Sequence, residues 1–129
     1  MGDSTTTTSI TSVRTVGVPV RDQDRALDFY TGVLGLQRAM DMDLGGGRRW
    51  IEVATQSGGT TIALVNASAS APAPVETGIR LCTPDAEALH AHLLEHGYSA
   101  DEVLRWPGVP PMFKFRDQDG NGLEIVEQA

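Results

Sequence analysis

The sequence contains an internal duplication, in which one pattern of strands and a helix occurs twice at an offset of 63 residues. Asp22 corresponds to Asp85, and Val18 corresponds to Leu81. In each half, an alternating apolar segment precedes an acidic helix start, and further short apolar segments follow. A repeat of this kind indicates one supersecondary unit that is used twice. The duplication therefore restricts the fold to two similar modules.

The first half predicts a strand over residues 13–20, a helix from Asp22 to about Val33, and strands over 36–43, 49–55 and 60–65. Asp22 is a favourable N-cap, and Gly35 is a favourable end for the helix. The glycine-rich segments 45–47 and 57–59 predict turns between the strands. This half therefore reads as a βαβββ unit.

The second half predicts a strand over residues 78–83, a helix from Asp85 that ends before Gly97, and strands over 102–106, 112–116 and 123–127. Residues 67–75 form an alanine-, serine- and proline-rich linker between the halves. We expect modules at 12–66 and 76–129, within one domain at 12–129, after a disordered tail at 1–11. The expected fold is α+β, with two tandem βαβββ modules, helices on the convex side of mixed sheets, and concave faces that form a cleft.

Composition narrows the range of functions. The formal net charge of −7 argues against a nucleic-acid partner. No apolar run approaches the length of a membrane span, and the N-terminus lacks the pattern of a secretory signal, so we expect a cytoplasmic protein with no membrane partner. The single cysteine, Cys82, excludes an intramolecular disulfide, and we expect it to be a small buried residue.

The closing segment, residues 115–127, predicts two strands joined by an acidic, glycine-containing turn. Asp119-Gly120 and Asn121-Gly122 are expected to supply the positive φ angles of such a turn. Glu124 stands in an apolar strand, and its side chain points away from those of its neighbours. A carboxylate on the inward face of a strand is a ligand, a base or half of an ion pair.

Residues 18–36 and 117–127 resemble the opening and closing motifs of the vicinal oxygen chelate superfamily. This superfamily includes glyoxalase I, extradiol dioxygenases, fosfomycin-resistance transferases and bleomycin-resistance proteins. The resemblance covers residues 13–127 and implies metal-ligand positions at Thr15, Ala63, Gly78 and Glu124. Only Glu124 is a metal-binding residue type, so the chain resembles a metal-free, bleomycin-resistance-like branch with no metal and no cofactor.

Strand parity predicts an inward-facing set that is mostly small and apolar, which favours a roomy cavity. The candidate ligand-binding residues are Thr15, Gly17, Trp50, Thr61, Ala63, Arg80, Trp106, Met112, Lys114 and Glu124. Arg80 and Glu124 are expected on neighbouring strands, either as a buried ion pair or with Glu124 holding a ligand amine or hydroxyl. Trp50 and Trp106 are expected at the cavity for stacking on an aromatic ligand, or alternatively in the core or a dimer interface.

Three histidines on the second predicted helix, His90, His92 and His96, invite a metal interpretation. His92 and His96 share a helix face, but no HExxH arrangement is present, and the helix lies on the convex side of the sheet. We therefore expect a solvated or half-buried helix face and no metal site.

These features lead to three hypotheses. The first is a metal-independent binding protein that sequesters a bulky, partly aromatic natural product or antibiotic in a cleft shared by two copies of the chain. The second is an enzyme: either a metal-dependent lyase, isomerase or dioxygenase, or a metal-free enzyme of secondary metabolism with Glu124 as base and Arg80 stabilising an oxyanion. The third is a regulatory or scaffold domain without a small ligand.

Overall fold

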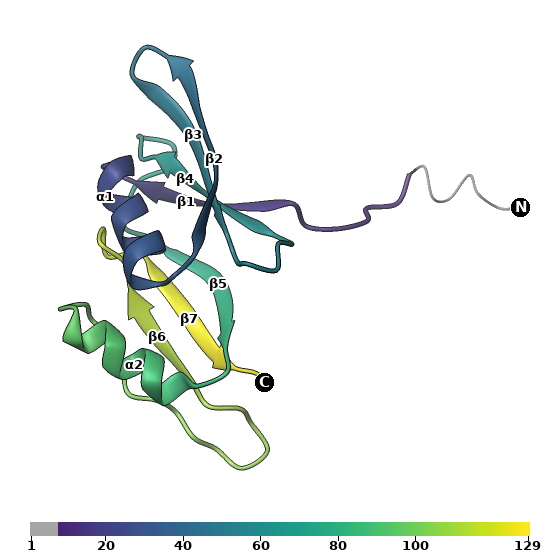
Figure 1. The fold of residues 1–129 in the computed structure, drawn as a ribbon, viewed down its shortest axis with the longest axis vertical. Helices are drawn as coiled ribbons and strands as arrows, with labels where there is room; N and C mark the ends of the chain where they lie inside the picture. The colour runs from purple at the N-terminus through teal and green to yellow at the C-terminus, as the bar shows by residue number, and fades with distance from the viewer. Residues whose placement is uncertain (1–7) are drawn as a thin grey trace, which may run out of the picture.

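The computed structural model describes residues 8–129, and the first seven residues of the predicted tail lie outside this range. In chain order the elements are β1 (Thr15–Val20), α1 (Gln23–Leu27), η2 (Asp28–Val33), β2 (Gln37–Gly45), β3 (Arg48–Ala54), β4 (Thr61–Asn66), β5 (Glu76–Thr83), α2 (Ala86–Glu95), β6 (Met112–Arg116) and β7 (Gly122–Glu127). They form a four-stranded sheet in the order β1-β4-β3-β2 and a three-stranded sheet in the order β5-β7-β6. The predicted α+β architecture with two modules is confirmed (Figure 1).

The first sheet is mixed, because β1 runs parallel to β4 whereas β3 is antiparallel to both β4 and β2. Alternation along β1 buries Val18 and Val20 on the side that the helix covers. β2 is an edge strand with one neighbour, and almost all of its residues are exposed. The β2–β3 hairpin projects beyond the rest of the first module (Figure 1).

Both helices begin at the predicted aspartates. The Asp22 carboxylate accepts a hydrogen bond from the Arg25 backbone N–H at 3.1 Å, and the Asp85 carboxylate accepts one from Ala88 at 3.0 Å. Each bond satisfies a backbone donor that the first helical turn leaves without a partner. The caps are therefore equivalent in the two modules.

The first helix widens into the π-helical segment η2 after one turn of α1. The Thr31 hydroxyl donates to the carbonyl of Leu27 at 2.6 Å, and the Leu34 N–H bonds the carbonyl of Phe29 at 3.0 Å. A threonine hydroxyl that bonds the preceding turn competes with the regular helical ladder. Gly35 then ends the helix with a φ of 77°, as its position in the sequence predicts.

The predicted strand at 102–106 is wrong, because this segment makes only an isolated bridge between Leu104 and Met112. The Asp101 N–H bonds the carbonyl of Lys114, and the Leu104 N–H bonds that of Met112. A step of three residues in this segment therefore lies opposite a step of two residues in β6. Such a mismatch interrupts a regular ladder. The prolines at 107, 110 and 111 also lack the N–H groups that would extend the pairing. The second sheet consequently has three strands.

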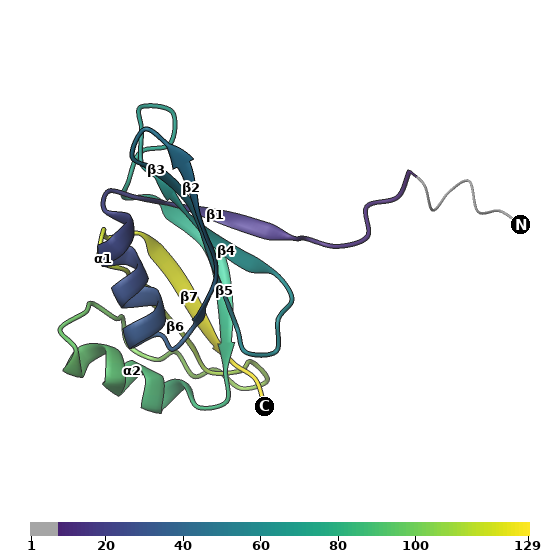
Figure 2. The same ribbon diagram turned by 45° about the horizontal axis from the view of Figure 1, so that its top comes forward.

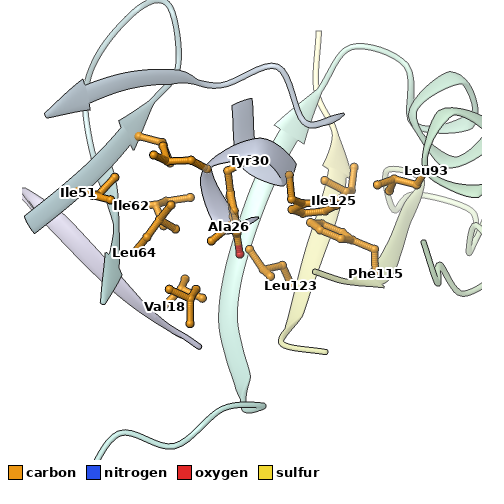
Figure 3. Close-up of a cluster of buried hydrophobic side chains, with 14 of the residues drawn as sticks. Val18, Ala26, Tyr30, Ile51, Ile62, Leu64, Leu93, Phe115, Leu123 and Ile125 are labelled. Carbon is orange, nitrogen blue, oxygen red and sulfur yellow. The ribbon is translucent and has the colours of Figure 1, made fainter. Parts of the chain in front are cut away.

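One hydrophobic core joins the two modules (Figure 3). Figure 3 shows Ala26 and Tyr30 of the first helical segment between the apolar side chains of the two sheets. The buried residues of the core include Val18, Ile51, Ile62 and Leu64 from the first module and Leu93, Phe113, Phe115, Leu123 and Ile125 from the second. Since side chains of both modules bury surface together, the modules support each other's stability.

The closing turn also ties the modules together through buried polar groups. Tyr30 donates a hydrogen bond to the Asp117 carboxylate at 2.7 Å, and the Asn121 amide donates to the carbonyl of Pro19 at 2.8 Å. The Val75 N–H bonds the side-chain oxygen of Asn121 at 2.9 Å. Asp117 and Asn121 are both buried. The turn therefore anchors the second module to the first.

Gly120 supplies the positive φ, 85°, on which this turn depends, whereas the positive φ expected at Asn121-Gly122 is not found.

Figure 2 shows α1 and α2 on one side of the molecule and the strands on the other. Within residues 8–129, no helix has the length and apolar character needed to cross a membrane.

Candidate ligand-binding site

The first module presents a second surface on the side of its sheet that faces away from the helix. Strand alternation places there Thr15, Gly17, Trp50, Glu52, Thr61 and Ala63, which we call the first-module face. Gly17 pairs with Ala63, so small residues form its floor. A Cβ atom at Gly17 would contact only Val65, at 3.7 Å, which leaves open space above the glycine.

Glu52 is the chemically distinctive residue of this face, with only 2% of its surface exposed. Its Oε2 accepts hydrogen bonds from the Trp50 indole N–H at 2.6 Å and from Arg14 at 3.2 Å. Its Oε1 accepts one from the Thr61 hydroxyl at 2.8 Å. The hydrogen bond from Trp50 is the largest cause, ahead of Thr61 and Arg14, of a lowered Glu52 pKa. The carboxylate is therefore ionised at neutral pH.

Sequence reasoning placed Trp50 on this face but did not identify Glu52. The signal was present, because Glu52 lies two residues after Trp50 and between the buried residues Ile51 and Val53. The same alternation that turns Trp50 inward also turns Glu52 inward. Trp50 itself is partly exposed.

The second module presents Arg80, Cys82, Met112, Lys114 and Glu124 on the corresponding side of its sheet, which we call the second-module face. Arg80 Nε donates to Glu124 Oε1 at 2.8 Å, and the two residues are paired across β5 and β7. The side chains are 60% and 35% exposed, so the expected buried ion pair is present but not buried. It is open because the pair projects from the side of the three-stranded sheet that faces away from α2.

Lys114 is paired with Glu124 in the strand register, but its ammonium group bonds another carboxylate. Lys114 Nζ donates to Glu76 Oε1 at 2.8 Å, and Arg116 also bonds the Glu76 carboxylate. These partners lower the pKa of Glu76, with the hydrogen bond from Lys114 the largest cause. The second-module face therefore carries two neighbouring sets of paired charges.

Two hollows lie at these surfaces. One, of about 500 Å³, is lined by Arg80, Asp101, Glu102, Leu104, Met112, Phe113, Lys114 and Glu124. The other, of about 420 Å³, lies where β1 approaches β5 and includes Gly17, Ile62, Ile79 and Leu81 in its lining. Arg80 borders both hollows. Gly17 and Arg80, one candidate residue from each module, therefore share the hollow of about 420 Å³, whereas Trp50 and Thr61 line neither hollow.

Trp106, Cys82 and His92 lie outside the two hollows. Trp106 precedes the proline-rich loop and is 60% exposed, and it lines neither hollow. The expectation of a buried Cys82 is wrong, because the residue is exposed and its thiol donates to the side-chain oxygen of Gln128 at 3.2 Å. β5 turns Cys82 onto the uncovered face of the sheet, which explains its exposure. On α2, His92 Nε2 bonds the carbonyl of Val33 at 2.8 Å.

The residues present do not fit a transition metal. Thr15 and Thr61 face each other with their hydroxyl oxygens 2.8 Å apart, and Ala63 lies opposite Gly17. Glu124 is bonded by Arg80. Within residues 8–129, no three histidine, cysteine, aspartate or glutamate side chains gather as a metal-binding group. Hydroxyls and one ion-paired carboxylate are a poor donor set for such a metal.

Comparison with known proteins places this geometry in context. Residues 12–125 match the family described as the Glyoxalase/Bleomycin resistance protein/Dioxygenase superfamily. Among solved structures, the chain is 31% identical to TnmS3, an antibiotic binding protein from Streptomyces sp. CB03234, with a TM-score of 0.81 over 94% of this chain and 98% of that one. A superfamily member from Sphaerobacter thermophilus is 30% identical, with a TM-score of 0.82 over 92% and 98% of the two chains.

A more distant likeness extends to an enzyme. Lactoylglutathione lyase from Agrobacterium tumefaciens is 17% identical, with a TM-score of 0.69 over 92% of this chain and 95% of that one. At this identity the likeness concerns the fold alone, because one fold hosts many activities. No curated protein sequence matches the chain.

Proposed function

We propose that this chain, which belongs to the Glyoxalase/Bleomycin resistance protein/Dioxygenase superfamily, binds and sequesters a bulky, partly aromatic natural product or antibiotic without a metal. The observation that carries the proposal is the likeness to an antibiotic binding protein, at 31% identity over 94% of the chain. The poor donor set at the family's metal positions supports the same conclusion.

The surface available to such a ligand is mixed in character. The first-module face offers an indole ring and a floor of small residues, and the second-module face offers a hollow of about 500 Å³ with an ion pair at its edge. Aromatic surface with a few fixed polar groups is typical of small-molecule sites. Each face by itself is open, so neither would enclose a large ligand alone.

We further propose that two copies of the chain complete the site by bringing the first-module face of one against the second-module face of the other. Large apolar side chains at the margins of the faces are exposed, among them Met42, Leu44, Leu104 and Trp106. β2, which carries two of them, is an uncovered edge strand. Symmetric pairing is the commonest way to cover such surfaces.

The test is calorimetric titration of the purified protein with a panel of aromatic antibiotics, combined with native mass spectrometry. We expect a stoichiometry of one ligand per chain, a dimer, and recovery of unmodified ligand after prolonged incubation. Binding that is unchanged by chelator treatment would support metal independence. The absence of binding across antibiotic classes, together with a monomeric mass, would contradict the proposal.

A metal-free enzyme remains the second candidate, because Glu124 Oε1 is bonded by Arg80 while the Glu124 side chain stays 35% exposed. A partly exposed carboxylate can abstract a proton, and a guanidinium beside it can stabilise the anion that forms. Conversion of the bound compound, lost in Glu124→Gln while binding is retained, would select this candidate. Chemically unchanged ligand in both proteins would select sequestration.

A further inference from the structure

The hydrogen bonds on the first-module face have a direction that follows from the charge of Glu52. An ionised carboxylate only accepts hydrogen bonds, so the Thr61 hydroxyl must donate its one proton to Glu52 Oε1, 2.8 Å away. The Thr15 hydroxyl oxygen at 2.8 Å and the Arg14 carbonyl at 3.3 Å also lie within reach of that proton, but both are uncharged, so the carboxylate is the preferred acceptor.

The Thr15 hydroxyl is then oriented by its neighbour. Since the proton of Thr61 is used, Thr15 must be the donor in the 2.8 Å contact between the two hydroxyls. Arg14 in turn donates to the Thr15 oxygen at 2.8 Å. Both hydroxyl protons are therefore consumed, and what the two threonines have left is acceptor lone pairs. Both residues are partly exposed, so a ligand can reach those lone pairs.

Trp50 is fixed by the same carboxylate. Its indole N–H is held by Glu52 Oε2 at 2.6 Å, so the partly exposed ring offers a ligand only its π face. The side chain of Arg14 is 70% exposed, so its remaining N–H groups are open to solvent. The face thus combines an aromatic wall with a set of hydrogen-bond acceptors.

We infer that the first-module face selects planar aromatic ligands that carry a hydrogen-bond donor, such as a hydroxyl or amino group, and that Glu52 is the positioning residue that sets this polarity. The inference deepens the proposed function and rests on it, because it concerns the same ligand site. A ligand whose ring edge carries only acceptors would face lone pairs and would leave its own acceptors unsatisfied on desolvation.

The experiment uses three probes that share the phenazine ring system and differ in one substituent: 2-hydroxyphenazine, 2-methoxyphenazine and unsubstituted phenazine. Affinities for the full chain are measured by isothermal titration calorimetry at pH 6. We expect 2-hydroxyphenazine to bind at least about fivefold more tightly than 2-methoxyphenazine, as one additional hydrogen bond predicts.

Glu52→Gln should abolish this preference to within about twofold, because the Gln amide can donate to Thr61 and free a hydroxyl proton for the ligand. Thr61→Val, which removes a hydroxyl at nearly constant shape, should also reduce the preference and serves if the Glu52 variant does not fold. Glu95→Gln, at an exposed position on α2 that lines neither hollow, is the matched control and should retain the wild-type ratio.

Each result decides the inference. Equal affinity of the hydroxy and methoxy probes, or a preference that persists in Glu52→Gln and Thr61→Val, would overturn it and leave the proposed function intact. Failure of all three phenazines to bind would also overturn the inferred ligand class, whereas the proposed function is decided separately by the antibiotic panel and the native mass.

Discussion

The Tyr30 hydroxyl donates a 2.7 Å hydrogen bond to Asp117, linking the first helical segment to the loop between β6 and β7. Asp117 also accepts from the side-chain and backbone N–H groups of Asn121 and from the backbone N–H of Asp119. A buried carboxylate with four donors organises both modules at once. This contact makes the closing turn a structural joint in addition to a family motif.

Replacing Asp117 with alanine should therefore destabilise the protein by about 2–4 kcal/mol, because buried donors on Tyr30 and Asn121 lose their acceptor. Urea denaturation monitored by circular dichroism measures the change. The matched control is Asp43→Ala, which removes an exposed carboxylate that accepts a local hydrogen bond from the Gly45 N–H. The control should cost less than about 1 kcal/mol, and equal losses in the two variants would contradict the role assigned to Asp117.

Stability should fall at alkaline pH because of Tyr30. Burial, followed by the charge of Asp117, raises the pKa of Tyr30 in the folded state. The phenol ionises near pH 10 in the unfolded chain, so its contribution is complete below that pH and is lost above it, by up to about 1.4 kcal/mol per pH unit.

Tyr30→Phe should remove this part of the decline between pH 10 and 11.5, at a cost of about 1–2 kcal/mol at pH 7 for the lost hydrogen bond. Urea midpoints across this pH range provide the measurement. An alkaline decline of the same steepness in the variant would show that Tyr30 does not cause it.

Glu52 should make stability fall at acidic pH, whereas Tyr30 makes it fall at alkaline pH. Its folded-state pKa is lowered, chiefly by the hydrogen bond from Trp50, so it stabilises the fold above the unfolded pKa of about 4.3 and this contribution is lost as pH falls through the folded pKa. The stability difference between wild type and Glu52→Gln should therefore shrink from pH 6 to pH 3.

Glu76→Gln is the comparison for this prediction. The pKa of Glu76 is also lowered, but its side chain is 57% exposed, and solvent weakens such ion pairs. We expect a smaller pH-dependent difference in this variant. A larger effect for Glu76 than for Glu52 would contradict the importance of burial at the first-module face.

The ion pair between Arg80 and Glu124 should contribute little to stability. Its two side chains are 60% and 35% exposed, and exposed pairs are typically coupled by less than about 1 kcal/mol. A double-mutant cycle of Arg80→Ala and Glu124→Ala, followed by thermal denaturation at low and high salt, measures this coupling. A coupling above about 2 kcal/mol would indicate that the pair is covered in solution, for example by a second copy of the chain.

The regular parts of this fold could be predicted from sequence because their signals are local. Helix starts at Asp22 and Asp85 depend on side chains that bond backbone groups three residues away, and these caps are confirmed. The duplication and the strand alternation likewise predicted two modules. The segment at 102–106 could not be predicted in this way, because its failure depends on a bulge against β6.

The site depended on relations that a single sequence does not show. Glu52 could have been assigned to the inward face by parity with Trp50, but two of its three donors, Arg14 and Thr61, lie outside its own strand, and Arg14 is 38 positions earlier in the chain. The pairing of Arg80 with Glu124 was predicted, but its exposure was not, since exposure depends on what covers the sheet. The structural role of Asp117 similarly arises from Tyr30, 87 positions earlier in the chain.

The polar groups of each face are satisfied within their own module. The donors to Glu52 all lie between Arg14 and Thr61, and the partner of Glu124 is Arg80. A substitution on one face therefore leaves the charges of the other face paired. Such a division lets natural selection explore new ligands one half-site at a time, while the shared core and the joint at Asp117 keep the scaffold unchanged.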